Sequence, residues 1–304
     1  MELVKKIDIH VHTDMWGGNE LPRQNGDRFA TPEELRAFFD KAGIEKGVLL
    51  PSVSPEALFA FQSNERTAEI VAKYPDTFVW FMGLDPRMGY NDPNCDFSRI
   101  IEHYKKLGAR GIAELTVNLP VDCELLDNLF FHAAKCDMPV TIHLAPDDEP
   151  LRNYGIMDSL GLPRLERMLK KHPKLKILGH SMMFWSHISG DITREHMNGF
   201  PGGRVTEGGA TVRLMREYEF LYGDMSAGSG ANAVMRDPEF GCRFIEEFQD
   251  KLYFGTDICS PKQVSHRLRL PMWLDEMVAA GKISEQAYRK VCRENAVKLL
   301  GLDE

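Results

Sequence analysis

The sequence predicts an α/β fold, a (β/α)8 TIM barrel with an extra C-terminal helix, as a single domain over residues 1–304. Eight short apolar runs recur along the chain, which is typical of parallel strands buried on both faces. Segments of helical length with a 3.6-residue period separate these runs, and no linker, repeat or low-complexity tract interrupts them. A doubly wound open sheet is the alternative, but it rarely extends to eight regular strand–helix units.

The expected strands share a continuous apolar character and are Lys6–Val11, Lys46–Leu50, Phe78–Leu84, Ala109–Leu115, Pro139–His143, Lys176–His180, Phe220–Asp224 and Leu252–Thr256. Thr31 begins the best-marked helix, because it can cap the first turn while Glu34 completes a capping box. Pro32 suits the first turn, and Gly43 stands where a left-handed helix end favours glycine. The other clear helical segments are Cys123–Lys135, Leu165–His172, Phe240–Phe248, Met272–Ala280 and a final helix over Ser284–Leu300.

Composition limits the class of protein. Lys and Arg number 37 against 45 Asp and Glu, and a net charge of −8 argues against a general nucleic-acid binder. No apolar run approaches the roughly 18–20 residues of a membrane-spanning helix, and the N-terminus lacks the apolar core of a signal peptide. The six cysteines are scattered without a Cys-x-x-Cys pair, so we expect reduced thiols in a cytoplasmic protein.

Three long loops each follow the C-terminal end of a strand: Thr13–Ala30, Ala145–Asp158 and Ser181–Gly209. In a barrel these ends share one rim, where active sites form. The last loop contains a glycine-rich stretch over 198–209, which suits either a mobile lid or a simple excursion.

His10 and His12 lie two residues apart on the first expected strand. Side chains alternate along a strand, so both imidazoles project to the same face. A His-x-His pair suits metal binding, although a hydrogen-bonded polar pair explains it slightly better when it is taken alone.

Other strand ends carry the same kind of residue. His143 ends the fifth expected strand, His180 ends the sixth, Asp257 follows the eighth, and Glu114 lies near the end of the fourth. Buried histidines are costly unless they have a role, so their convergence on one rim predicts a metal centre.

The ordered set of motifs resembles the metal-dependent amidohydrolase superfamily, over essentially the whole chain. The likeness is to its amidohydrolase-related branch (amidohydrolase 2), which includes aromatic-acid decarboxylases and dicarboxylate lactonases. It rests on Asp8-Ile-His10-Val-His12, Leu107-Gly-Ala-Arg-Gly111, His143, His180, Phe254-Gly-Thr-Asp257 and the closing segment Glu294–Gly301. The resemblance implies that His10, His12, His143 and Asp257 bind metal and that His180 is the catalytic or substrate-polarising histidine.

Glu114 departs from the decarboxylase-type members, which generally have no metal-binding carboxylate after the fourth strand. It resembles the strand-four glutamate of other superfamily members, which ligates or bridges metal. The alternative is a glutamate paired with a nearby arginine such as Arg110.

Nitrogen and oxygen ligands without thiolate suit Zn²⁺, with Mn²⁺ or Fe²⁺ as alternatives, and we expect one ion rather than two. Three histidines and one aspartate leave a position for water, whose pKa zinc can lower to about 7. We therefore expect a hydrolase of a small organic-acid ester, lactone or amide. Asp257 would accept the proton from water, and His180 would stabilise the oxyanion. The alternative is non-oxidative decarboxylation of an aromatic or unsaturated carboxylic acid.

The expected partner is a small-molecule substrate, not a nucleic acid or a membrane, and a homodimer is usual for this branch. Trp16, Arg152 and Trp185 lie on rim loops and are the candidate substrate contacts, although loop anchoring or solvent exposure also explains them. Asp224 and Ser226 follow the seventh strand on the same rim, where they either shape the pocket or cap the strand end.

Overall fold

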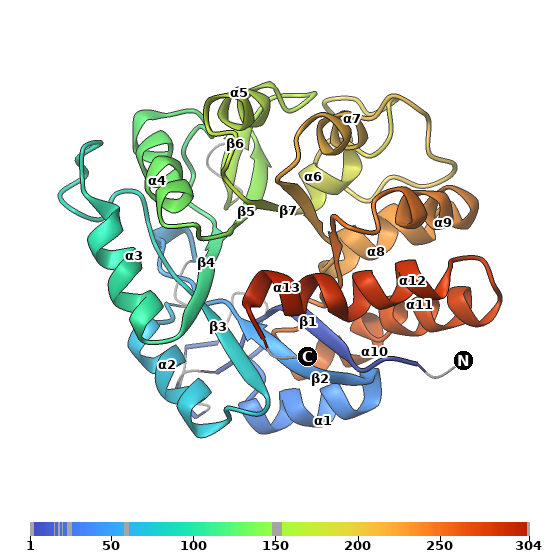
Figure 1. The fold of residues 1–304 in the computed structure, drawn as a ribbon, viewed down its shortest axis with the longest axis horizontal. Helices are drawn as coiled ribbons and strands as arrows, with labels where there is room; N and C mark the ends of the chain where they lie inside the picture. The colour runs from blue at the N-terminus through green and yellow to red at the C-terminus, as the bar shows by residue number, and fades with distance from the viewer. Residues whose placement is uncertain are drawn as a thin grey trace.

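The fold is a parallel barrel ringed by helices (Figure 1). The computed structural model describes residues 3–14, 16–17, 19, 21–22, 26–57, 61–147 and 154–302. The barrel strands pair in the order β1 (Lys6–Val11), β2 (Ile44–Leu49), β3 (Phe78–Met82), β4 (Ala109–Leu115), β5 (Val140–Pro146), β7 (Ile177–His180), β8 (Leu221–Asp224) and β9 (Leu252–Tyr253). Every pairing along this path is parallel, which confirms the predicted fold class.

The barrel closes between its first strand and the segment that follows β9. Ile9 N donates to Phe254 O over 3.0 Å, and Asp257 N donates to His10 O over 2.8 Å. These hydrogen bonds join β1 to the segment after β9 and place Asp257 beside His10 and His12.

Helices follow nearly every strand. They are α1 (Pro32–Ala42), α2 (Asn64–Lys73), α3 (Phe97–Lys106), α4 (Glu124–Lys135), α5 (Pro163–Lys171), α6 (Met182–Ser186), α7 (Ala210–Glu217), α8 (Ala227–Met235), α9 (Pro238–Glu247), α10 (Val264–Arg267), α11 (Arg269–Ala279), α12 (Glu285–Arg289) and α13 (Asn295–Leu300), with short segments η1 (Pro55–Ala57), η2 (Pro261–Gln263) and η3 (Lys290–Glu294). Among the described helices, none combines the length and apolar character that crossing a bilayer requires.

Helix α1 has the ends that the sequence predicts. The Thr31 side chain accepts from Glu34 N, and the Glu34 carboxylate accepts from Thr31 N, so the capping box forms. Gly43 ends the helix at φ 67°, in the left-handed region where a side chain is disfavoured.

The C-terminal run differs in detail from the single helix expected over Ser284–Leu300. It consists of α12, the π-helical segment η3 and α13 in direct succession. Phe254 N donates to Val291 O over 3.0 Å, which ties η3 to the chain just after β9. In Figure 1 the red α13 lies next to the blue β1, so the run packs against the seam of the barrel.

Two further features were not predicted. Strand β6 (Ile156–Asp158) forms within the expected loop 145–158 and pairs with β5, which extends to Pro146. Helix α8 consists largely of alanine, glycine and serine, so it lacks the apolar period that identifies a helix.

The glycine-rich stretch over 198–209 is held in place by hydrogen bonds, among them Val205 N to Asp237 and Thr206 N to Ser189.

Candidate metal centre

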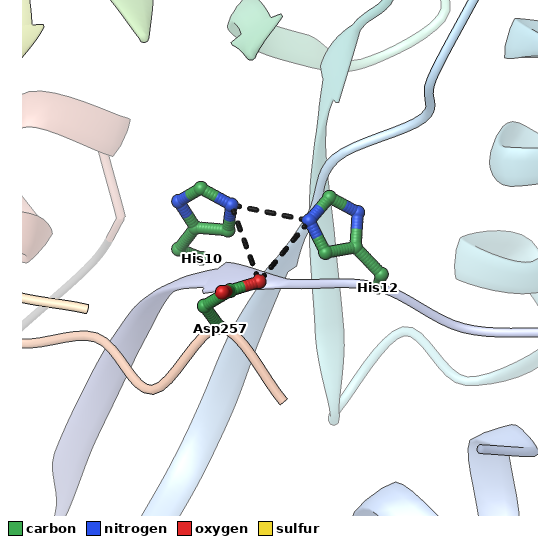
Figure 2. A group of neighbouring side chains, drawn as sticks. All are labelled: His10, His12 and Asp257. Atoms are coloured by element: carbon green, nitrogen blue, oxygen red, sulfur yellow. Dashed lines mark hydrogen bonds and ion pairs between the residues drawn. The ribbon is translucent and has the colours of Figure 1, made fainter. Parts of the chain in front are cut away.

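Two histidines and an aspartate converge where the barrel closes (Figure 2). His10 lies near the end of β1 and His12 directly follows it, and their Nε2 atoms lie 3.1 Å apart. Oδ1 of Asp257 lies 3.8 Å from Nε2 of His10 and 3.5 Å from Nε2 of His12. Ligand atoms that are each about 2 Å from one zinc ion lie roughly 3–3.5 Å from one another. Two of the three separations fall within this range and the third, from Asp257 to His10, exceeds it by 0.3 Å, so a small shift of the carboxylate would let all three bind one ion.

The other ring nitrogen of each histidine is already hydrogen-bonded. Nδ1 of His10 lies 2.6 Å from Oδ2 of Asp224, and Nδ1 of His12 lies 2.8 Å from the carbonyl oxygen of Leu50. A carboxylate and a carbonyl only accept, so both histidines donate from Nδ1. In the neutral rings the Nε2 lone pairs then face each other and the carboxylate of Asp257.

A cation would fit between the two Nε2 atoms and the carboxylate of Asp257. His10 is fully buried, His12 is 7% exposed, and their Nε2 atoms lie 3.1 Å apart, which is too close for a water molecule between them. Burial lowers the pKa of His10, but Asp224, Glu114 and Asp257 outweigh burial and raise it to about 10. A proton on His10 relieves the repulsion in the metal-free chain, and a divalent ion would do so in its place.

A second group adjoins the first. It consists of Glu114 near the end of β4, His143 on β5 and His180 at the end of β7. Oε1 of Glu114 lies 2.6 Å from Nδ1 of His143 and 3.6 Å from Nε2 of His180. These three residue types also suit a divalent ion such as zinc.

Glu114 links the two groups. Its other oxygen, Oε2, lies 3.8 Å from Nε2 of both His10 and His12. Burial raises the pKa of Glu114, but the surrounding histidines, His143 first, hold it well below its usual range. The partners of Glu114 are therefore histidines. Among the described residues it contacts no arginine, which was the alternative that the sequence left open.

His180 is buried between the two groups. Its Nδ1 lies 2.9 Å from Ser226 Oγ, while its ring centre lies 4.5 Å from that of His10. Burial, together with the nearby charge of His10, lowers the pKa of His180 to about 4. His180 is therefore neutral near pH 7 and has a nitrogen available to accept a proton.

Arg267 is a neighbour of the site that the sequence did not predict. It lies in α10, is 10% exposed, and places Nη2 3.2 Å from Oδ2 of Asp257. Burial would raise the pKa of Asp257, but Arg267 and the histidines keep it below its usual range. No motif marks Arg267, because its role depends on how the loop after β9 turns back.

The three expected substrate contacts have different positions. Trp16 is 67% exposed on the loop after β1, and Arg152 lies outside the described residues. Trp185 is 2% exposed in α6, where its Nε1 donates to Asp224 O over 2.8 Å. An aromatic ring that was not predicted does reach the site: Tyr154 packs 4.5 Å from the ring of His143.

The amidohydrolase model (Amidohydro_2) matches residues 7–302 of the chain. The chain belongs to the amidohydrolase family. This confirms the resemblance on which the expected ligand set rests. No curated protein matches the amidohydrolase chain.

Solved structures share this amidohydrolase fold at low sequence identity. An uncharacterised TIM-barrel protein from Bordetella bronchiseptica is 17% identical, with a TM-score of 0.66 and 98% and 99% of the two chains covered. A 2,6-dihydroxybenzoate decarboxylase from Rhizobium is 18% identical, with a TM-score of 0.59 and coverage of 99% and 100%. A probable 2-pyrone-4,6-dicarboxylic acid hydrolase from Acinetobacter baumannii is 13% identical, with a TM-score of 0.60 and coverage of 98% and 100%.

Proposed function

We propose that the chain is a metal-dependent hydrolase of a small organic-acid ester, lactone or amide. The observation that supports hydrolysis most is the position of Glu114 between two groups of ligands. Paired metal sites bridged in this way are common in enzymes that activate water and stabilise the leaving oxygen. The family and its metal-type residues support an enzyme, and the reaction itself is the proposal.

Each group would hold its ion with the atoms that remain free. The first ion would be bound by His10, His12 and Asp257, and the second by Glu114 and His143, so that Nε2 of His180 stays free beside them. The sequence favoured one ion, whereas the two oxygens of Glu114 support a second. Zinc is the expected ion, and Mn²⁺ or Fe²⁺ also suits these ligands. A bound zinc ion supplies a Lewis acid and lowers the pKa of water to about 7.

His180 is the residue best placed to move the proton. It is neutral near pH 7, and its Nε2 faces Glu114 while Nδ1 is held by Ser226. Nε2 would accept the proton from the attacking water and return it to the leaving group.

Both carboxylate oxygens of Asp257 already face a partner, which limits its role as a base. Its Oδ1 faces the histidines of β1, and its Oδ2 faces the guanidinium of Arg267. The hydrogen bond from Arg267 stabilises the charged carboxylate and weakens it as a base. We therefore assign Asp257 mainly to metal binding, with proton relay secondary to His180.

Incubation in ¹⁸O-labelled water tests the proposal. Purified, metal-supplemented protein is offered a panel of lactones, esters and amides of small acids. Hydrolysis places ¹⁸O in the product acid, and His180→Asn should lose most of the turnover while retaining its metal. Metal-loaded protein that hydrolyses no member of the panel contradicts the proposal.

Decarboxylation is the second candidate, supported by the decarboxylases among the structural neighbours. A 5-carboxyvanillate decarboxylase from Sphingomonas paucimobilis covers 99% of this chain at 17% identity, with a TM-score of 0.61. Release of CO₂ from aromatic acids, without uptake of ¹⁸O, would favour this reaction over hydrolysis.

A cytoplasmic location also remains our proposal, consistent with the six free cysteines.

A further inference from the structure

Asp224 contacts one histidine of each ligand group, and with His10 and His180 it forms a third cluster of metal-type residues. It ends β8 and is 1% exposed. Its Oδ2 lies 2.6 Å from Nδ1 of His10 and 3.4 Å from Nδ1 of His180. One carboxylate oxygen therefore stands behind two rings whose Nε2 atoms point to the proposed metal centre.

Ser226 completes the contact with His180. Its Oγ lies 2.9 Å from Nδ1 of His180, and its backbone N donates to Oδ1 of Asp224 over 3.0 Å. The turn from Asp224 to Ser226 thus occupies the outward nitrogens of both His10 and His180. His10 cannot rotate or change tautomer without breaking its hydrogen bond to Asp224, and His180 cannot rotate without losing its contact with Ser226.

The surrounding chain fixes this turn. Trp185 donates its indole N–H to Asp224 O over 2.8 Å, and Met225 N donates to Tyr253 O over 3.0 Å. A Cβ at Gly255 would lie 2.8 Å from Cβ of Ser226 and 3.0 Å from Oδ1 of Asp224. The glycine of the Phe254-Gly-Thr-Asp257 motif therefore leaves the space that the turn needs.

We infer that Asp224, with Ser226, is a shared positioning device that holds His10 and His180 with Nε2 directed to the metal. The inference rests on the proposed function only in that it assumes a metal at this centre. The 2.6 Å contact with Nδ1 of His10 is a hydrogen-bond distance, which leaves no room for an ion between the two atoms. Asp224 therefore acts through the ligands and is not one itself.

The expected effect of losing Asp224 is a weaker metal site. Partners behind ligating histidines typically change metal affinity or activity by about 10- to 100-fold when removed. Asp224→Asn keeps the shape but removes the charge, so we expect metal affinity to fall within this range. Ser226→Ala removes the hydroxyl beside His180 and Asp224 but leaves the Asp224–His10 hydrogen bond, so it should lower affinity less than Asp224→Asn does.

The test compares Asp224→Asn, Asp224→Ala and Ser226→Ala with Ser229→Ala, a buried serine of α8 outside the site. Zn²⁺ affinity is measured by competition with a chelator, and the number of ions at saturation by elemental analysis. The absorption spectrum of the Co²⁺-loaded protein reports ligand geometry. Circular dichroism and the unfolding midpoint verify that each variant is folded.

The positioning role predicts weaker affinity in Asp224→Asn with unchanged stoichiometry at saturation, an altered Co²⁺ spectrum and no change in Ser229→Ala. Unchanged affinity in folded Asp224→Asn overturns the inference. A lower number of ions at saturating Zn²⁺ also overturns it, because Asp224 would then be a ligand. If Asp224→Ala does not fold, the isosteric Asp224→Asn decides.

The proposed function can fail separately from this inference. Wild-type protein that binds metal but hydrolyses nothing contradicts the hydrolase alone, and the affinity comparison still applies. If wild type takes up no metal, the proton NMR signal of the His10 Nδ1–H gives an independent measurement. A downfield signal that is present in wild type and lost in Asp224→Asn supports the hydrogen bond, and its absence from wild type overturns the inference.

Discussion

Oε1 of Glu114 lies 2.6 Å from Nδ1 of His143, which joins neighbouring strands of the barrel at their C-terminal ends. The second oxygen of the same carboxylate faces the histidines of β1. Glu114 thus contacts both groups of ligands. Replacing it tests whether the second group binds an ion of its own.

Glu114→Gln keeps the shape of the side chain and removes its charge. We expect metal at saturation to fall from about two equivalents to about one, and turnover to fall about 10- to 100-fold. Elemental analysis and steady-state kinetics measure both, with the exposed Glu276→Gln as control. Full metal content and full activity in Glu114→Gln would remove Glu114 from the ligand set.

Trp185→Phe removes the indole N–H that binds Asp224 O and leaves a buried carbonyl without that donor. Such a loss costs about 1–3 kcal/mol of unfolding free energy. Urea unfolding measures it, and Trp16→Phe on the exposed loop should change stability by less than about 0.5 kcal/mol. Equal effects of the two substitutions would show that Trp185 does not support the barrel wall.

Gly255→Ala introduces a methyl group 2.8 Å from Cβ of Ser226. Overpacking of this kind typically costs about 1–3 kcal/mol, and the displaced turn should also weaken metal binding. Gly202→Ala is the matched control, because its Cβ would meet no atom within 4 Å. A Gly255→Ala protein with wild-type stability and metal affinity would contradict the tight packing around the turn.

Glu166 makes stability depend on pH in acid. Contacts with Arg213 and Lys170 lower its pKa in the folded chain from 4.5 to about 2. The stabilisation is therefore complete above pH 4.5 and is lost as the pH falls from 4.5 towards 2. These ion pairs lie near the surface, so Glu166→Gln should lower the free energy of unfolding by only about 0.5–1 kcal/mol at pH 6. The difference in stability between wild type and variant should shrink by pH 3. Urea unfolding at the two pH values measures it, and a constant difference would contradict the shift.

The sequence predicts the parts of this molecule that follow from periodicity. Strand β4 matches its expected bounds, and the ends of α1 match because Thr31 and Gly43 act locally. His10, His12 and Asp257 lie together as expected, whereas His143, which the resemblance placed in the same ligand set, groups with Glu114 and His180 instead. All of them come from strand ends that share one rim.

The sequence does not predict the contacts that depend on how loops return to the rim. Arg267 reaches Asp257 from a short helix, and Tyr154 reaches His143 after a loop, without a spacing that marks either. For Trp185 the sequence suggests a substrate contact, because it is an aromatic residue on an expected rim loop. In the structure its indole N–H instead donates to the backbone carbonyl of Asp224. The substrate-contact roles of Trp16 and Trp185 remain predictions.

A metal ion held by His10 and His12 should be detectable directly as metal content. Protein purified without added metal is compared by elemental analysis with the His10→Ala/His12→Ala variant, before and after incubation with Zn²⁺ or Mn²⁺. We expect at least about one equivalent of divalent metal in wild type, and loss of that metal in the variant. Wild-type protein that contains no metal and takes up none would contradict a metal centre and the hydrolytic function built on it.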